Sequence, residues 1–407
     1  MSTLAAQSPQ SIFPGEPVCR ACGGDGLRTF ATSPEIPVNN ARVFDDVDDA
    51  RRVPSGALEL ALCPACGFIQ NVRFDPELVR YDATYEEQQG FSPTFTAFAD
   101  ALAGQVIERF DLRGKRVVEI GCGKGDFLAS VCERGGNVGL GLDPTADPER
   151  LSEGAAQLVT LRREFFGPHT GAIDADAVIC RHTLEHIADV RAFVRDLRSS
   201  LAGSPGVRVL CEVPDVGRVL RDGAFWDVYY EHCSYFTPGS LARLFRDCGF
   251  AVDDVRLAFE DQYVLLEARI AGDGASGVPR DAEESPESLA ALVERYAAGV
   301  AAETRGWSER ILAARSRGER VAIWGSGSKC VAFLSETGTA DVIDAVVDIN
   351  PHRQGRYLPA TGIVVSAPEA LADAPPDLVI VMNAAYVGEI GAQLARMGLA
   401  PAVEAVG

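Results

Sequence analysis

The chain has 407 residues, of which 47% are hydrophobic and 24% are charged, and its formal net charge is -20. This length predicts two or three domains, and the sequence has no apolar run of about 18 residues that could span a bilayer. The acidic balance argues against a nucleic-acid partner, because a net negative charge repels phosphate backbones.

Three segments of different composition follow one another along the chain. Residues 1–80 hold paired cysteines and many turn formers, whereas residues 81–275 and 286–407 alternate apolar strands with amphipathic helices. A stretch rich in Gly, Pro and Ser over residues 271–288 is typical of a linker between the last two. The alternation predicts an α/β fold with parallel sheets covered by helices. In chain order we expect helices at 93–110, 126–134 and 289–316, and strands at 116–120 and 138–142.

The first 17 residues lack the basic start and the apolar stretch of a signal peptide, so we expect a cytoplasmic protein that does not act at a membrane. Its eleven cysteines are then free thiols or metal ligands, because a reducing compartment does not sustain disulfides. Cys19 and Cys22 form one CxxC pair, and Cys63 and Cys66 form another. Two such pairs predict a tetrahedral Zn²⁺ site of four thiolates, with a structural role because no coordination position stays open.

A glycine-rich turn follows the strand predicted at 116–120. Glu119 ends the strand, and Gly121, Gly123 and Gly125 let the backbone approach a ligand closely before the next helix. Asp143 ends the following strand, where an acidic side chain can accept hydrogen bonds from ribose hydroxyls. This spacing fits both a nicotinamide cofactor and S-adenosylmethionine.

A later strand, DAVICRHTLEHI at residues 176–187, resembles the fourth-strand signature of class I S-adenosylmethionine methyltransferases. The resemblance implies that S-adenosylmethionine is the cofactor. It also implies that Glu119, the glycine turn and Asp143 surround it, with Cys180 and Arg181 alongside.

Histidines gather near the predicted carboxyl edge of the same sheet, where open α/β sheets bind ligands. His182 and His186 follow the strand above, and His232 lies in the aromatic and acidic run WDVYYEHCSYFTP. A histidine can take up a proton near neutral pH, with Glu231 or a tyrosine hydroxyl to orient it. The alternative is an aromatic core strip with one buried histidine.

The paired cysteines, the glycine turn, the Tyr229-x-Glu231-His232 motif and the segments WGSGSK and DINPHRQGRYLPATGI together resemble the sugar C-methyltransferase family. That resemblance implies a zinc module, a class I Rossmann-like methyltransferase domain and a C-terminal Rossmann-like α/β domain that helps to hold a nucleotide-linked ketosugar. It further implies methylation at a carbon next to the ketone, with His232 as general base supported by Glu231 and Tyr229. His186 and an N-terminal tyrosine, Tyr85 in preference to Tyr81, are then expected to line the pocket.

The C-terminal segment has a second strand, glycine turn and helix from residue 321, and the amides at such a helix start bind anions. Either a structural lobe or a binding site for the substrate's diphosphate fits this pattern. The expected binding residues are Gly325, Gly327, Ser328, Lys329, Asp348, Asn350, Met382 and Asn383. Residues 81–95 and 359–362 depart from the family pattern, which leaves the acceptor open.

Three other functions are compatible with the sequence. One is O- or N-methylation of a small natural product, with His232 deprotonating a hydroxyl or an amine. The second is an NAD-dependent oxidoreductase that uses the second glycine turn, and the third is a zinc-containing scaffold protein. We expect a monomer or a weak homodimer with a small-molecule substrate.

Overall fold

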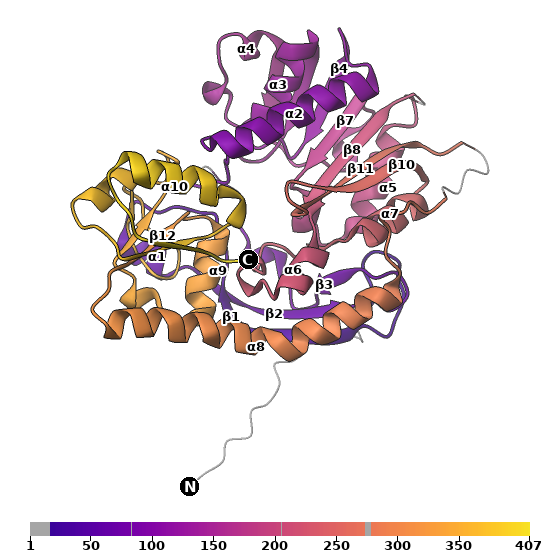
Figure 1. Cartoon of the computed structure of the whole chain (residues 1–407). Helices are drawn as coiled ribbons and strands as arrows, with labels where there is room; N and C mark the ends of the chain where they lie inside the picture. Colours follow the sequence, from indigo (N-terminus) through magenta and orange to yellow (C-terminus); the bar gives the residue numbers. More distant parts are fainter. Residues whose placement is uncertain (1–16, 83, 205, 273–277) are drawn as a thin grey trace.

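The computed structural model describes residues 17–407 except Ala83, Pro205 and residues 273–277. The expected leader, and residues 273–277 of the expected linker, lie outside the described residues. Figure 1 shows the methyltransferase-like domain and the C-terminal α/β domain side by side, with the first sheet and the long helix α8 running along both.

The N-terminal segment forms a four-stranded antiparallel sheet in the order β1-β2-β3-β9. Its last strand comes from the middle of the chain and begins two residues after His232. The N-terminal segment therefore does not complete this sheet by itself. The elements are β1 (Arg28–Pro37), α1 (Val47–Arg51), β2 (Ser55–Leu62), β3 (Ile69–Asn71) and β9 (Ser234–Tyr235).

The middle segment forms a seven-stranded sheet in the order β10-β11-β8-β7-β4-β5-β6, in which β11 alone runs antiparallel to its neighbours. This arrangement confirms the class I methyltransferase fold. Its strands are β4 (Arg116–Ile120), β5 (Val138–Leu142), β6 (Val159–Arg162), β7 (Ala177–Arg181), β8 (Arg208–Pro214), β10 (Phe250–Ala258) and β11 (Tyr263–Ile270). Its helices are α2 (Pro93–Phe110), α3 (Asp126–Gly135), α4 (Ala155–Leu158), α5 (Val190–Ser200), α6 (Val216–Asp222) and α7 (Pro238–Asp247).

The C-terminal segment forms a five-stranded parallel sheet in the order β14-β13-β12-β15-β16, which confirms the second α/β domain. Its strands are β12 (Val321–Trp324), β13 (Ala345–Val347), β14 (Val365–Ser366), β15 (Leu378–Val381) and β16 (Ala402–Ala405), with helices α9 (Ser328–Thr337) and α10 (Val387–Arg396). Helix α8 (Pro286–Ser316) begins three residues earlier than expected, inside the expected linker. Ser285 caps it by accepting a hydrogen bond from the Ser288 amide, and proline suits the first helical position.

One apolar cluster joins the N-terminal sheet to the C-terminal domain. It includes Leu60 of β2, Trp226 and Tyr230 of the loop before β9, Ile311 of α8 and Phe333 of α9, each at most 1% exposed. Such continuous burial fixes how these elements sit relative to one another. Among the described residues, no helix has both the length and the apolar character needed to cross a membrane.

Candidate active site

A cavity of about 1060 Å³ lies between the carboxyl ends of the methyltransferase strands and the C-terminal domain. Residues from all three segments of the chain line it, including Tyr81, Gly121, His232 and Gly325. Open α/β sheets bind ligands at this edge. The position therefore agrees with the sequence-based expectation.

The glycine turn between β4 and α3 is held to the end of β5. Gly121, Gly123 and Gly125 have φ angles of 71°, 52° and 89°, a region that favours glycine. The Gly123 amide donates to Asp143 Oδ2 at 2.9 Å, and the Thr145 hydroxyl donates to Asp143 Oδ1 at 2.8 Å. Asp143 therefore fixes the shape of the turn from the neighbouring strand.

Glu119, the second-last residue of β4, is a buried carboxylate that lines the cavity. Burial raises its pKa to about 8, although the positive charge of Arg181 acts in the opposite direction. Its Oε2 atom accepts no hydrogen bond from any described residue. A buried oxygen without a donor is costly, so this atom is suited to a donor that a ligand brings into the cavity.

Arg181 also lines the cavity and is held in place on two sides. Its guanidinium donates to Glu212 on β8 at 2.7 Å and 3.2 Å, and it lies 4.0 Å from the ring centroid of Phe127. Cys180 precedes it on β7, so its side chain points to the opposite face of the sheet. Cys180 is packed in the core and does not line the cavity.

His182 follows β7 with a φ of 47°, and its Nε2 atom lies 2.9 Å from Glu212 Oε1. Burial lowers the pKa of His182. The negative charges of Glu212 and Glu185, together with the hydrogen bonds that these carboxylates accept from His182, outweigh this effect and raise the pKa to about 9. The folded-state pKa thus lies above the unfolded value of about 6.5. Its contribution to the free energy of unfolding is complete below pH 6.5 and is lost as the pH rises to about 9.

We therefore expect the stability of the wild type to fall between pH 6.5 and 9, and this dependence to be weaker in His182→Gln. Denaturant unfolding at several pH values measures it. His169→Gln is the matched control, because His169 is exposed. An equal pH dependence in His182→Gln and wild type would contradict the assignment.

Two further histidines meet in the cavity. The rings of His186 and His232 have centroids 4.9 Å apart and lie at 80° to each other. The Tyr229 ring lies 4.1 Å from the His232 ring, and the Tyr81 hydroxyl lies 3.0 Å from His186 Nδ1. Burial, followed by the charge of His186, holds the pKa of His232 well below its usual value, so its imidazole is neutral at pH 7.

The two N-terminal tyrosines have different places. Tyr81 contacts His186 directly, whereas Tyr85 packs its ring against Tyr81 with centroids 5.1 Å apart. Both line the cavity. Tyr81 therefore makes the histidine contact that was expected of an N-terminal tyrosine, and Tyr85 packs against Tyr81.

Glu231 does not line the cavity beside His232. Burial raises its pKa to about 7, and the backbone amides of Asn39, Asn40 and Ala41 face its carboxylate and lower the pKa. The side chain lies beside the loop before α1, but neither carboxylate oxygen has a hydrogen-bond partner among the described residues. Among the described residues, no hydrogen bond or ion pair joins it to the His232 imidazole, so any support that it gives acts through the backbone.

A carboxylate whose charge acts on His232 is Asp227, a residue that the sequence did not single out. Asp227 Oδ2 lies 2.8 Å from Lys329 Nζ, and Asp227 also pairs with Arg218. Its negative charge raises the pKa of His232 against the effect of burial. Asp227 and His232 are only five residues apart in the same aromatic run. This short separation was the one feature of the sequence that could have indicated the interaction.

The C-terminal glycine turn lies on the cavity, and several of the polar groups around it already have partners. Lys329 is paired with Asp227 as described, and the Asn350 amide donates to Glu86 Oε1 at 3.0 Å. The Gly325 amide donates to the Val347 carbonyl at 2.9 Å. Gly327, at the start of α9, has open space beside its Cα atom. Ser328, Asp348, Met382 and Asn383 also line the cavity.

Residues 85–92 connect the two α/β domains across the cavity, a connection that the sequence did not predict. Glu86 pairs with Arg150 of the methyltransferase domain at 2.9 Å as well as with Asn350. Arg353 donates to the Glu86 carbonyl at 2.5 Å, and Ser92 donates to Glu389 near the start of α10 at 2.7 Å. The sequence contains no pattern that predicts these contacts. Apart from the pair with Arg150, the partners are separated by more than 260 residues along the chain.

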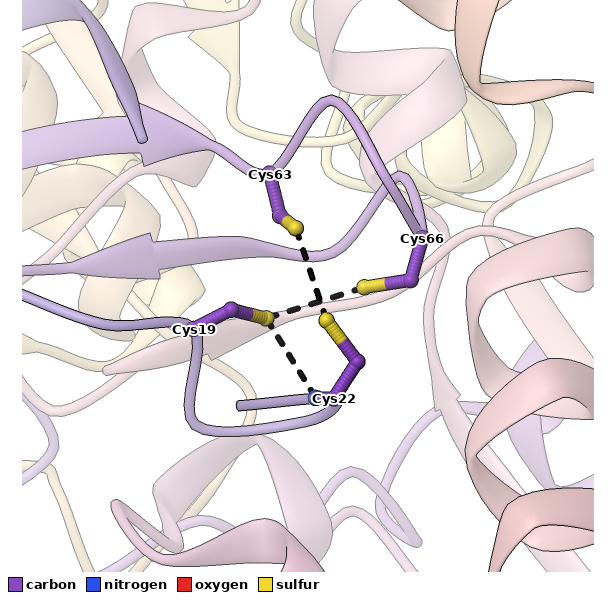
Figure 2. A group of neighbouring side chains, drawn as sticks. All are labelled: Cys19, Cys22, Cys63 and Cys66. Atoms are coloured by element: carbon purple, nitrogen blue, oxygen red, sulfur yellow. Dashed lines mark hydrogen bonds between the residues drawn. The ribbon is translucent and has the colours of Figure 1, made fainter. Parts of the chain in front are cut away.

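The four N-terminal cysteines meet at one point, as Figure 2 shows. The sulfurs of Cys19 and Cys66 are 3.6 Å apart, as are those of Cys22 and Cys63. Thiolates about 2.3 Å from one tetrahedral zinc ion lie about 3.8 Å apart, so the arrangement fits that ion. The structure thus brings all four predicted ligands together.

Comparisons with known proteins agree with this organisation. Residues 95–255 match the family described as a methyltransferase domain, and residues 281–400 match the C-methyltransferase C-terminal domain. The chain is 26% identical over 397 residues to the C-methyltransferase NovU of Streptomyces niveus, covering 91% of this chain and 90% of NovU.

Shorter similarities are restricted to part of the chain. A ubiquinone biosynthesis O-methyltransferase of Cronobacter sakazakii is 35% identical over 101 residues, covering 23% of this chain and 40% of that protein. The solved 1,6-didemethyltoxoflavin-N1-methyltransferase of Burkholderia thailandensis has a TM-score of 0.35 and 18% identity, covering 44% of this chain and 82% of that one. The chain thus contains a methyltransferase domain followed by a C-methyltransferase C-terminal domain, is similar to a C-methyltransferase over almost its whole length, and is an S-adenosylmethionine-dependent methyltransferase.

Proposed function

We propose that the protein transfers a methyl group to a carbon next to the ketone of a nucleotide-linked ketosugar, with His232 as general base. The observation that carries this proposal is a neutral histidine, flanked by tyrosines, in the same cavity as the glycine turn. The full-length similarity to a C-methyltransferase supports methylation at carbon.

The residues around the glycine turn fit S-adenosylmethionine, which supplies an electrophilic methyl group on a sulfonium. Gly121, Gly123 and Gly125 leave room for its approach, and the unpartnered Oε2 of Glu119 can accept from its ammonium group. Asp143, at the end of β5, and Arg181, on β7, complete the group of residues proposed to surround the cofactor. Cys180 would act only through the backbone, since its side chain packs in the core.

Gly121→Ala tests this cofactor site. A Cβ atom at residue 121 would lie 1.8 Å from Thr183 Oγ1, at a φ that disfavours alanine. We expect the Kd for S-adenosylmethionine to rise at least about tenfold, as measured by calorimetry. Gly114→Ala is the control, because Gly114 has a similar φ of 64° and no atom within 4 Å of its Cβ position. Equal affinities of the two variants would contradict the close approach at Gly121.

The base must remove a proton from carbon, which is easier when a neighbouring ketone delocalises the charge as an enolate. His232 is neutral and can accept that proton, and Asp227 then stabilises the imidazolium. The hydroxyls of Tyr229 and Tyr81 stay protonated, because burial raises the pKa of each well above 10. They can therefore donate to the enolate oxygen.

We further propose that the four cysteines hold a structural Zn²⁺. Their closed, four-ligand geometry leaves no position for a substrate. The ion would fix the turn between β2 and β3. Strand β3 pairs with β9, which lies close to His232 in the sequence.

For the acceptor, we propose that its nucleotide part binds on the C-terminal side of the cavity. Gly325, Gly327, Lys329 and Asn350 line that side, and the amides at the start of α9 suit a phosphate. The Lys329 ammonium group would then interact with both the Asp227 carboxylate and the phosphate.

The deciding experiment incubates the enzyme with a panel of dTDP-linked and UDP-linked ketosugars and S-adenosylmethionine labelled with ¹³C at the methyl group. We expect a two-dimensional NMR correlation that joins the new methyl to a ring carbon. With S-adenosylhomocysteine in D₂O, deuterium should enter at the same carbon. A methyl on oxygen or nitrogen would instead establish the alternative, O- or N-methylation.

A further inference from the structure

A second group of potential metal ligands lies in the cavity, separate from the cysteines. Glu185, His186 and His232 each offer a ligand atom, and these atoms lie within 4.8 Å of one another. Two atoms that are each about 2.1 Å from one ion are at most about 4.2 Å apart. Side-chain shifts of less than about 1 Å therefore bring the three atoms to one ion.

One oxygen of the carboxylate in this group lacks a donor. Glu185 is 2% exposed, and its Oε2 atom accepts no hydrogen bond from a described residue. Its Oε1 atom lies 3.6 Å from His182 Nδ1. A buried oxygen in this state is suited to a cation in the cavity.

The surroundings of His186 orient it as a ligand. Its Nδ1 atom lies 3.1 Å from the Glu231 carbonyl oxygen, so that Nδ1–H can donate there. This tautomer leaves the Nε2 lone pair free. Metal-binding histidines commonly donate their other ring N–H to a carbonyl or carboxylate in this way.

We propose that Glu185, His186 and His232 bind a divalent transition-metal ion such as Zn²⁺, Co²⁺ or Ni²⁺. Two imidazoles and one carboxylate favour these ions over Mg²⁺. Three protein ligands leave a coordination position open toward the cavity, unlike the closed site of four cysteines.

If His232 is the general base, as in the proposed function, ion binding at this site affects activity. The ion uses the lone pair with which His232 would accept a proton, so ion binding and proton abstraction exclude each other. The ion is therefore an inhibitor that acts at the catalytic base.

The test titrates Co²⁺ into the full chain after confirming one zinc per chain by elemental analysis. We expect one equivalent of Co²⁺ to bind with visible d–d bands and without the charge-transfer bands of cobalt thiolate. Affinity should fall roughly tenfold or more in Glu185→Gln and in His186→Asn, since even outer-shell changes weaken metal sites by 10- to 100-fold. His169→Asn, at an exposed histidine, should bind as the wild type does.

Wild-type affinity in both ligand variants, or no binding beyond the zinc already present, would overturn the proposal. Circular dichroism establishes that each variant is folded. The titration needs no acceptor, so its failure is distinct from failure of the proposed reaction. If instead Co²⁺ binds but His232→Asn retains turnover, the metal site stands and the assignment of the base fails.

Discussion

His232→Asn is expected to lower kcat by at least about a hundredfold, the range that general-base catalysis contributes, while the Kd for S-adenosylmethionine changes less than about twofold. The asparagine cannot accept the proton, whereas the groups proposed to hold the cofactor lie on β4, β5 and β7 and remain in place. Steady-state rates with labelled methyl donor measure the first effect, and calorimetry measures the second.

His169→Asn provides the control for a histidine replacement on the surface. Deuterium uptake into the acceptor should disappear together with methyl transfer, since both need proton removal. Because the pKa of His232 lies well below 6.5, the wild-type rate should not fall as the pH decreases from 8 to 6.5. Turnover at a tenth of wild type or more in His232→Asn would show that another group is the base.

The elements of the methyltransferase domain were predictable because local sequence determines them. The helix expected at 93–110 has these bounds in the structure, since Ser92 caps its start and Asp111 ends it in the left-handed conformation. The strands at 116–120 and 138–142 are also confirmed, and the helix at 126–134 extends one residue further, to Gly135. Apolar runs and glycine turns carry enough information to place such elements.

Contacts between distant segments were not predictable in this way. β9 joins a sheet whose other strands end more than 160 residues earlier, and nothing in its two residues indicates that partner. Glu86 meets Asn350 across 264 residues. Spacing along the chain predicts neighbours within a helix or along a strand, but it does not specify which loops face each other across a cavity.

The role of Glu231 illustrates the limit for the site. Its position next to His232 suggests direct support, but adjacent residues commonly point in different directions. Glu231 lies near the amides of residues 39–41, while Asp227 supplies a negative charge that raises the pKa of His232. The residue types indicated the chemistry, but the path of the backbone determines which carboxylates come near the imidazole.

Cys63→Ser is expected to reduce the zinc content from one ion per chain to nearly none and to lower Tm by at least about 5 °C. Structural zinc contributes about 10 kcal/mol or more to the folding of small zinc modules, so losing one of four ligands removes a large part of the local stability. Elemental analysis and thermal unfolding measure the two effects. Cys248→Ser is the control, because Cys248 is a buried cysteine outside the four-cysteine group.

The same variant should also lose activity, because the zinc site is connected to the catalytic base. Cys63 and Cys66 lie in the turn between β2 and β3, Arg243 donates to the Cys66 carbonyl at 2.9 Å, and β3 pairs with β9. Since β9 begins two residues after His232, disorder in the turn would displace the base. An unchanged zinc content in Cys63→Ser would refute the four-thiolate site, whereas zinc loss with full activity would show that the base is held without the module.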